Sequence, residues 1–457
     1  MRRIAILFFA LFPSLLFAQE GYTIKGQLTG KVPAIVYFTS VYGERATLLD
    51  SVKPDPAGKF LFKLRPGLQP GLYRLVWGKD QLLDLVFNKE NIEFSTVALF
   101  PADSIHFISS DENRIYYFFR RIDRLTQSKM EVLTPVLDYY PDNDDYYLRS
   151  VMKYEFIQKE ESRILDSLAS RNPGFYAIRM FKTMKTPFIS GSLLKDDRIN
   201  WLKTHFFDGA DFQDTLLIHS NVWSNKAISY LALYSDNRLS QKQLETEFIK
   251  AVTVILSSAS GNAEVFKFLL DYIVGGFDKY HFDDVITYIA DNFQDPFACE
   301  DQARKTALQK KLDNFKKIAI GKQAPDFDLT DNKGKHIKLS ASNSEYTLVV
   351  FWSSECGHCA EMLPKVKKLY EGQKHKRFEI IAVSIDTSRT EWTGFLKQEK
   401  LNWINVCDFK GFAGPATEEY NIYATPTMFL LDRNKKILAK PVSYRELEEA
   451  LKENGLL

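Results

Sequence analysis

Two of the chain's four cysteines, Cys356 and Cys359, lie three positions apart in the stretch VVFWSSECGHCAEMLP. Paired thiols at this spacing exchange disulfides, form half of a zinc site or close a structural disulfide. The residues before them include an uninterrupted apolar run, TLVVFW, which is typical of a strand buried on both faces. We expect this strand to end just before Cys356 and a helix to begin there.

A helix that begins at Cys356 would make its thiol more acidic. The first helical turn leaves backbone N–H groups unpaired and carries the positive end of the helix dipole, and both stabilise a thiolate. Cys359 would lie one turn further along on the same side and should be less exposed. We therefore predict that Cys356 attacks disulfides and that Cys359 resolves the mixed disulfide that results.

The two residues between the cysteines, Gly357 and His358, should tune the redox potential. A histidine near the thiolate stabilises the reduced, charged form, which makes the disulfide form more oxidising. We expect a potential nearer ~−180 mV than ~−270 mV.

Three further features flank the cysteine pair. Trp352 precedes it, Pro364 follows Cys359 by five residues, and Thr425-Pro426 comes about seventy residues after the pair. In this order they resemble the thioredoxin superfamily. An additional strand and helix before Pro426 resemble its TlpA-like branch of extracytoplasmic thiol-disulfide oxidoreductases. The resemblance covers residues 318–457.

The resemblance implies how Thr425 and Pro426 act. In that family the matching proline is cis and faces the dithiol, and the backbone of the preceding residue pairs with the substrate strand. The resemblance also implies that no bound cofactor is needed, because the Cys356–Cys359 disulfide carries the electrons. Protein thiols and disulfides of the cell envelope would be the partners, together with a membrane electron donor, in a setting like that of cytochrome c biogenesis.

The chain departs from the family pattern where a proton acceptor for the buried thiol is expected. Many thioredoxins carry an aspartate six residues before the first cysteine, and Val350 stands there. The acid that follows the second cysteine is Glu361, one residue earlier than in the TlpA-like pattern, and Glu355 replaces a common tryptophan. Glu355 and Glu361 are the candidates for deprotonating Cys359, and the alternative for each is a plain surface role.

Other uses of the cysteine pair are less well supported. Zinc would need two more ligands, whereas Cys299 and Cys407 are isolated, so we predict no metal and assign both residues to buried apolar positions. A covalent haem would need histidine directly after Cys359, where Ala360 stands. A structural disulfide over this spacing would constrain the unfolded chain little.

Two functional alternatives stay open. A peroxiredoxin-like peroxidase has a related fold and a Thr or Ser three residues before its reactive thiolate, and here Ser353 precedes a complete dithiol motif. The other alternative is a cell-envelope binding protein whose redox domain is subordinate.

The rest of the chain predicts a multidomain protein. Residues 19–110 consist of short β-rich runs between turn-forming residues, which indicates an all-β, sandwich-like domain. Residues 111–317 show helical periodicity and predict an all-α domain. In residues 318–457 strands and helices alternate, which predicts an α/β thioredoxin-like fold with a largely parallel sheet. This order also resembles secreted proteins of Bacteroidetes-type bacteria.

The first residues predict export. A basic start, an apolar run and the small residue Ala18 indicate a signal peptide over residues 1–18. The run is shorter than the roughly 20 residues that span a bilayer, and no later segment is long and apolar enough to do so. We expect a periplasmic or secreted protein. A formal net charge of +2 provides no basic surplus for nucleic acid.

Overall fold

The computed structural model describes residues 21–280, 282–293, 307–373 and 377–457. The expected signal peptide and Cys299 lie outside these residues. The chain forms two compact units. The first contains the residues up to Ser235 together with Val254–Tyr272, and the second contains Asp236–Thr253 and Ile273–Leu457.

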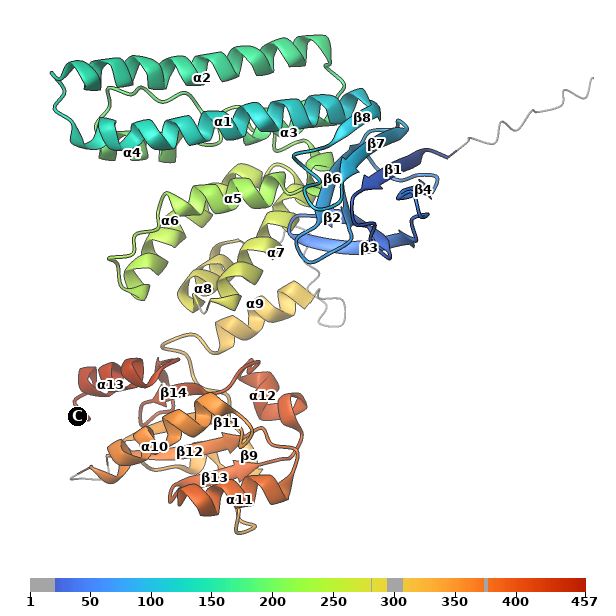
Figure 1. Cartoon of the computed structure of the whole chain (residues 1–457). Coiled ribbons are helices and arrows are strands. Elements are labelled where there is room, and N and C mark those ends of the chain that lie inside the picture. The colour runs from blue at the N-terminus through green and yellow to red at the C-terminus, as the bar shows by residue number, and fades with distance from the viewer. Residues whose placement is uncertain (1–20, 281, 294–306, 374–376) are drawn as a thin grey trace, which may run out of the picture. The chain divides into compact units, whose positions relative to one another are not determined.

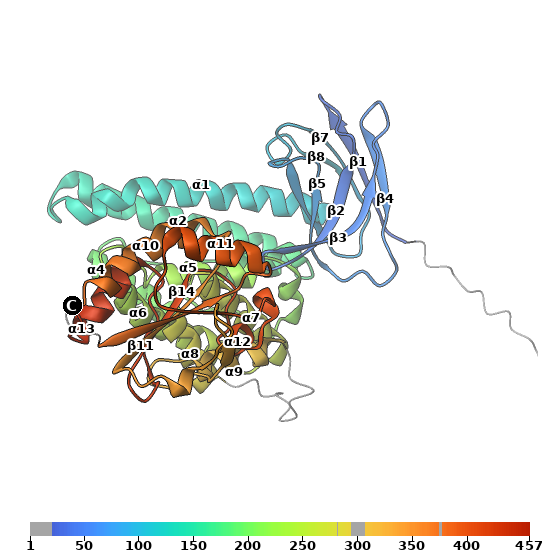
Figure 2. The ribbon, with the colours of Figure 1, turned by 90° about the horizontal axis from the view of Figure 1, so that it is seen from below.

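The first unit begins with eight strands arranged in two sheets (Figures 1 and 2). They are β1 (Thr23–Thr29), β2 (Val36–Tyr42), β3 (Arg45–Val52), β4 (Lys59–Lys63), β5 (Gly71–Val76), β6 (Leu82–Phe87), β7 (Ile92–Val97) and β8 (His106–Ser109). The sheet orders are β4-β1-β7-β8 and β3-β2-β5-β6. Inward side chains such as Phe62 and Phe94 of one sheet and Phe38 and Leu85 of the other form one core. β1 and β7, which are distant in the chain, pair in parallel, whereas the other strand pairs of these two sheets are antiparallel.

Helices follow the strands. They are α1 (Asp111–Tyr139), α2 (Asp145–Arg171), α3 (Tyr176–Met184), α4 (Lys195–His205), α5 (Val222–Ala232), α6 (Gln241–Ala259), α7 (Ala263–Lys279), α8 (Asp283–Asn292) and α9 (Ala307–Lys317). The side chains of Ser110 and Asp144 cap α1 and α2 by accepting hydrogen bonds from backbone N–H groups of the first turn. Because α6 and α7 contribute residues to both units, the division at residues 110 and 317 stays a prediction.

The C-terminal part of the second unit has the expected thioredoxin-like fold, with helices around a five-stranded sheet (Figure 1). Its strands are β9 (Asp328–Thr330), β10 (His336–Lys338), β11 (Tyr346–Trp352), β12 (Phe378–Ser384), β13 (Ile404–Cys407), β14 (Thr427–Leu431) and β15 (Ile437–Ala439). Its helices are α10 (Gly357–Glu371), α11 (Arg389–Glu399), α12 (Pro415–Glu419) and α13 (Tyr444–Glu453). Strands β9 and β10 form an antiparallel hairpin.

The sheet order is β13-β12-β11-β14-β15. The expectation of a largely parallel sheet is wrong for half of it, because β14 runs antiparallel to β11 and β15 antiparallel to β14. The short β14–β15 connection permits only an antiparallel pair, whereas β11, β12 and β13 are joined in parallel through helices. The central strand β11 is buried on both faces, as its apolar run predicts.

Each face of β11 contributes to a separate core. Leu348, Val350 and Trp352 pack with side chains of α10, α11 and α13. Val349 and Phe351 pack on the opposite face, with side chains from α12 and from residues 318–339. The strand is therefore held from both sides, and it delivers the chain to the first turn of α10 at a fixed position.

Candidate active site

Cys356 is the N-cap residue of α10, and its sulfur faces the first turn of that helix. The sulfur accepts a hydrogen bond from the backbone N–H of Cys359, with 3.2 Å between nitrogen and sulfur. Cys356 is partly exposed and Cys359 is fully buried, and both are free thiols. The structure thus has the unequal exposure of the two sulfurs that the spacing predicts.

Thr425 and Pro426 lie directly beside this pair. The Cys356 thiol donates a hydrogen bond to the Thr425 carbonyl oxygen, 3.3 Å away, across 69 positions of the chain. The peptide bond between Thr425 and Pro426 is cis, as the family resemblance implies. The loop before β14 is thereby brought to the reactive sulfur.

The two thiols differ in acidity. Partial burial by itself would raise the pKa of Cys356. Hydrogen bonds from the side chains of Cys359 and Thr425 and from the backbone N–H groups of Cys359 and His358 outweigh burial and lower that pKa below its ordinary value. Burial, followed by the hydrogen bond with Cys356, raises the pKa of Cys359 to about 12. Cys356 is therefore the sulfur that is readily ionised.

Asp386, two residues beyond β12, fixes the turn that leads into the cysteine pair. Its carboxylate accepts hydrogen bonds from the hydroxyls of Ser353 (2.8 Å), Ser354 (3.0 Å) and Ser384 (2.7 Å). The backbone N–H of Ser354 donates to it as well, at 2.9 Å. The sequence analysis did not identify Asp386. The available signal was its place just after a strand parallel to β11, since the carboxyl ends of parallel neighbours meet at one edge.

Trp352 is a core residue. Its side chain is fully buried, with its ring centroid 5.1 Å from that of Phe395. Trp352 packs in the core below the turn that leads into the cysteine pair, and its ring is not at the surface.

Glu355 and Glu361, the expected proton acceptors, are both exposed. In the part of the chain that the structure describes, no hydrogen bond joins either carboxylate to Cys359. Val350, at the position where many thioredoxins carry an aspartate, is fully buried among apolar side chains. The role of the two glutamates in deprotonating Cys359 therefore stays a prediction.

Cys407, at the end of β13, is buried and lies in the same core as Cys359, in keeping with its expected apolar position. Its thiol donates a weak hydrogen bond to the Asp386 carbonyl oxygen, 3.4 Å away. Among the described residues, no group of three or more His, Cys, Asp or Glu side chains is arranged to hold a metal ion.

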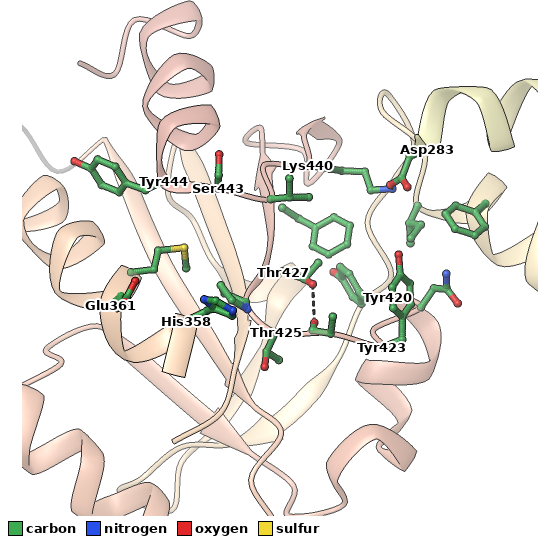
Figure 3. A pocket seen from close by; sticks show the side chains of 18 of the residues that line it. Asp283, His358, Glu361, Tyr420, Tyr423, Thr425, Thr427, Lys440, Ser443 and Tyr444 are labelled. Carbon is green, nitrogen blue, oxygen red and sulfur yellow. Dashed lines mark hydrogen bonds and ion pairs between the residues drawn. The ribbon is translucent and has the colours of Figure 1, made fainter. Parts of the chain in front are cut away.

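A pocket of about 470 Å³ is lined in part by Thr425, the residue whose carbonyl oxygen accepts the hydrogen bond from Cys356 (Figure 3). Its walls include His358 and Glu361 of α10 and the loop that carries Thr425 and Pro426. Gly357 lies between Cys356 and the pocket residue His358 in the chain. Apart from its chain neighbours and the backbone of its own helix, no atom lies within 4 Å of the point where a β-carbon would stand on it.

Residues of the C-terminal part of the chain are similar to known proteins. Residues 320–440 match the AhpC/TSA family. The chain is 33% identical over 150 residues to the thiol-disulfide oxidoreductase ResA of Bacillus cereus, covering 32% of this chain and 85% of that protein. It is 30% identical over 137 residues to ResA of Geobacillus kaustophilus, covering 29% and 77%. A solved thiol-disulfide oxidoreductase from Bacteroides fragilis is 34% identical, with a TM-score of 0.27, and covers 29% of this chain and 99% of that one.

Proposed function

Because this chain belongs to the thioredoxin-like thiol-disulfide oxidoreductases, we propose that it exchanges disulfides with proteins of the cell envelope through Cys356 and Cys359. The observation that carries the proposal is the ionisable, partly exposed sulfur of Cys356 at the start of α10, beside the Thr425 carbonyl and an open pocket.

The reductive direction proceeds in two displacements. The Cys356 thiolate attacks one sulfur of a substrate disulfide, an S–S bond forms between enzyme and substrate, and the other substrate sulfur leaves as a thiolate that takes up a proton. Cys359 then loses its proton and attacks the Cys356 sulfur, which releases the second substrate thiol. The enzyme keeps the Cys356–Cys359 disulfide and the substrate has gained two electrons. The same steps in reverse oxidise a substrate dithiol.

The geometry favours Cys356 as the attacking thiol and Cys359 as the resolving thiol. The donors around Cys356 stabilise its thiolate, whereas burial keeps Cys359 protonated until Cys356 is engaged in a mixed disulfide. Consumption of the Cys356 thiolate removes the negative charge that raises the pKa of Cys359. Resolution therefore becomes easier once the substrate is bound covalently. The exchange itself needs no bound cofactor.

The setting that we propose is the periplasm or the extracellular space, with a membrane protein as the electron donor. The support is the basic and apolar start of the chain and the extracytoplasmic family that the active-site motif resembles. In the described part of the chain, no helix is both long and apolar enough to cross a membrane.

A trapping experiment tests the proposal. Cys359→Ser should accumulate a mixed disulfide between Cys356 and substrate proteins, and Cys356→Ser should abolish insulin reduction and exchange with glutathione. Cys407→Ser serves as the control, since Cys407 is a buried thiol outside the exchange. Failure of the unaltered protein to exchange disulfides would overturn the proposal. Turnover of hydrogen peroxide with a dithiol donor would instead favour the peroxiredoxin-like alternative.

A further inference from the structure

One wall of the pocket beside the dithiol comes from outside the region that matches the AhpC/TSA family. That region comprises residues 320–440, whereas Asp283 at the start of α8 and Phe315 near the end of α9 also line the pocket (Figure 3). Both residues belong to the same compact unit as the cysteine pair. Asp283 of α8 and Phe315 of α9 thus add to the pocket a wall that lies outside the matched region, and we call it the α8–α9 wall.

The added wall is held in place by a partly buried ion pair. The Lys440 ammonium contacts the Asp283 carboxylate, and the two side chains are 13% and 27% exposed. The ammonium also lies 5.8 Å from the ring centroid of Phe315 and 5.9 Å from that of Phe429. Since a buried charge needs a partner, loss of one member alone should destabilise this contact of the wall. A second ion pair, Lys317 with Glu419 at 3.4 Å, ties α9 to α12 without lining the pocket.

The lining of the pocket includes both aromatic and charged residues. Phe315, Tyr420 and Phe429 are almost fully buried, whereas Tyr423 is exposed. His358, Glu361 and Lys365 lie on the α10 side. A volume of about 470 Å³ is large enough for a bulky side chain and a short length of backbone. Aromatic walls of this kind favour an aromatic guest, through edge-to-face and stacked contacts.

The position of the pocket relates it to the reacting cysteine of a substrate. In an extended polypeptide, side chains two residues apart point to the same side and lie about 7 Å apart. A substrate cysteine at Cys356 would therefore send the side chain two residues away along the Thr425–Thr427 segment, into the pocket. We propose that the α8–α9 wall selects polypeptides that carry an aromatic side chain two residues from the reacting cysteine. This inference rests on the proposed disulfide exchange.

The test uses the full chain and short peptides in which the single cysteine is disulfide-linked to glutathione. Peptides with Phe two residues before or after the cysteine are compared with the same peptides carrying Ala. We expect kcat/KM for one of the Phe peptides to exceed that of its Ala partner by about tenfold, as burial of a large apolar side chain implies. Glutathione disulfide, which has no such side chain, measures exchange alone.

Removal of the wall should remove this preference. Asp283→Ala leaves the Lys440 ammonium without its partner and should reduce the Phe preference to less than about threefold, with glutathione disulfide turnover unchanged. Tyr423→Ala, at a side chain that is 47% exposed, provides a second variant that should fold normally and lose part of the preference. Lys317→Met breaks the other ion pair and should keep the full preference.

The outcomes separate the two proposals. If glutathione disulfide is not exchanged, the proposed function fails. If glutathione disulfide is exchanged but the unaltered protein shows no Phe preference, the assignment of the α8–α9 wall is wrong. It is also wrong if the wall variants keep the Phe preference.

Discussion

The sulfur of Cys356 lies 3.3 Å from the carbonyl oxygen of Thr425, and this contact joins the start of α10 to the loop before β14. The same sulfur accepts a hydrogen bond from the backbone N–H of Cys359. The reactive atom therefore sits where a helix start and a substrate-binding loop meet, and the predictions below follow from the groups that surround it.

The Cys359 side chain should lower the pKa of Cys356, because it is the first of the hydrogen-bonding groups that stabilise the thiolate. Cys359→Ala removes that donor and should raise the pKa of Cys356 and slow its alkylation several-fold at neutral pH. The pH dependence of iodoacetamide labelling measures both. Cys407→Ala should leave the profile unchanged, and an unchanged profile in Cys359→Ala would show that the thiol makes no contribution.

Substitution can separate the effect of the His358 backbone N–H on the redox potential from the effect of its imidazole ring. Its backbone N–H is one of the groups that lower the pKa of Cys356, and proline has no N–H to donate. His358→Pro should weaken the reduced form and make the potential more negative by about 30 mV for each tenfold loss in thiolate stabilisation. His358→Ala keeps the N–H and removes only the imidazole. Equilibration with glutathione measures the potentials, and equal shifts in the two variants would assign the whole effect to the ring.

Asp386→Ala should destabilise the C-terminal part of the chain by about 3 kcal/mol, because three serine hydroxyls and one backbone N–H lose their common acceptor. Asp386→Asn keeps an oxygen for Ser353 and Ser354 and should lose less. Urea unfolding measures the stability. The control is Ser388→Ala, which removes only the half-buried N-cap of α11. A loss no larger in Asp386→Ala than in this control would show that Asp386 does not hold the turn.

Local patterns predicted the elements around the site well. The apolar run of β11 indicated burial on both faces, and the structure places Val350 and Phe351 in separate cores. The start of α10 at the cysteine pair followed from the same local signals.

Relations between distant segments were not predictable in this way. The direction of β14 depends on how it pairs with β11, which no local pattern records. Asp386 reaches Ser353 across 33 positions, and Lys440 reaches Asp283 across 157. Such contacts depend on how the sheet and helices assemble, so an isolated carboxylate in the sequence carries little sign of them.

The first unit contains a pair of carboxylates that should make its stability depend on pH. Burial, followed by the nearby Asp123, raises the pKa of Glu161 to about 7, and burial also raises the pKa of Asp123. Glu161 lies on α2 and Asp123 on α1. The other groups near the pair are Lys185, Thr126, Gln127 and Arg120. Because folding favours the protonated form of Glu161, its stabilising contribution is complete below about pH 4.5 and is lost as the pH rises through about 7.

Glu161→Gln keeps a neutral side chain at every pH and should therefore flatten this dependence. Urea unfolding at pH 5 and pH 8 should show a smaller loss of stability at the higher pH in the variant than in the unaltered protein. Glu160→Gln is the matched control, because Glu160 is a neighbouring glutamate that pairs with Arg163 at the surface. If Glu161→Gln and Glu160→Gln gave the same pH profile, the carboxylate pair between α1 and α2 would not be the source of the dependence.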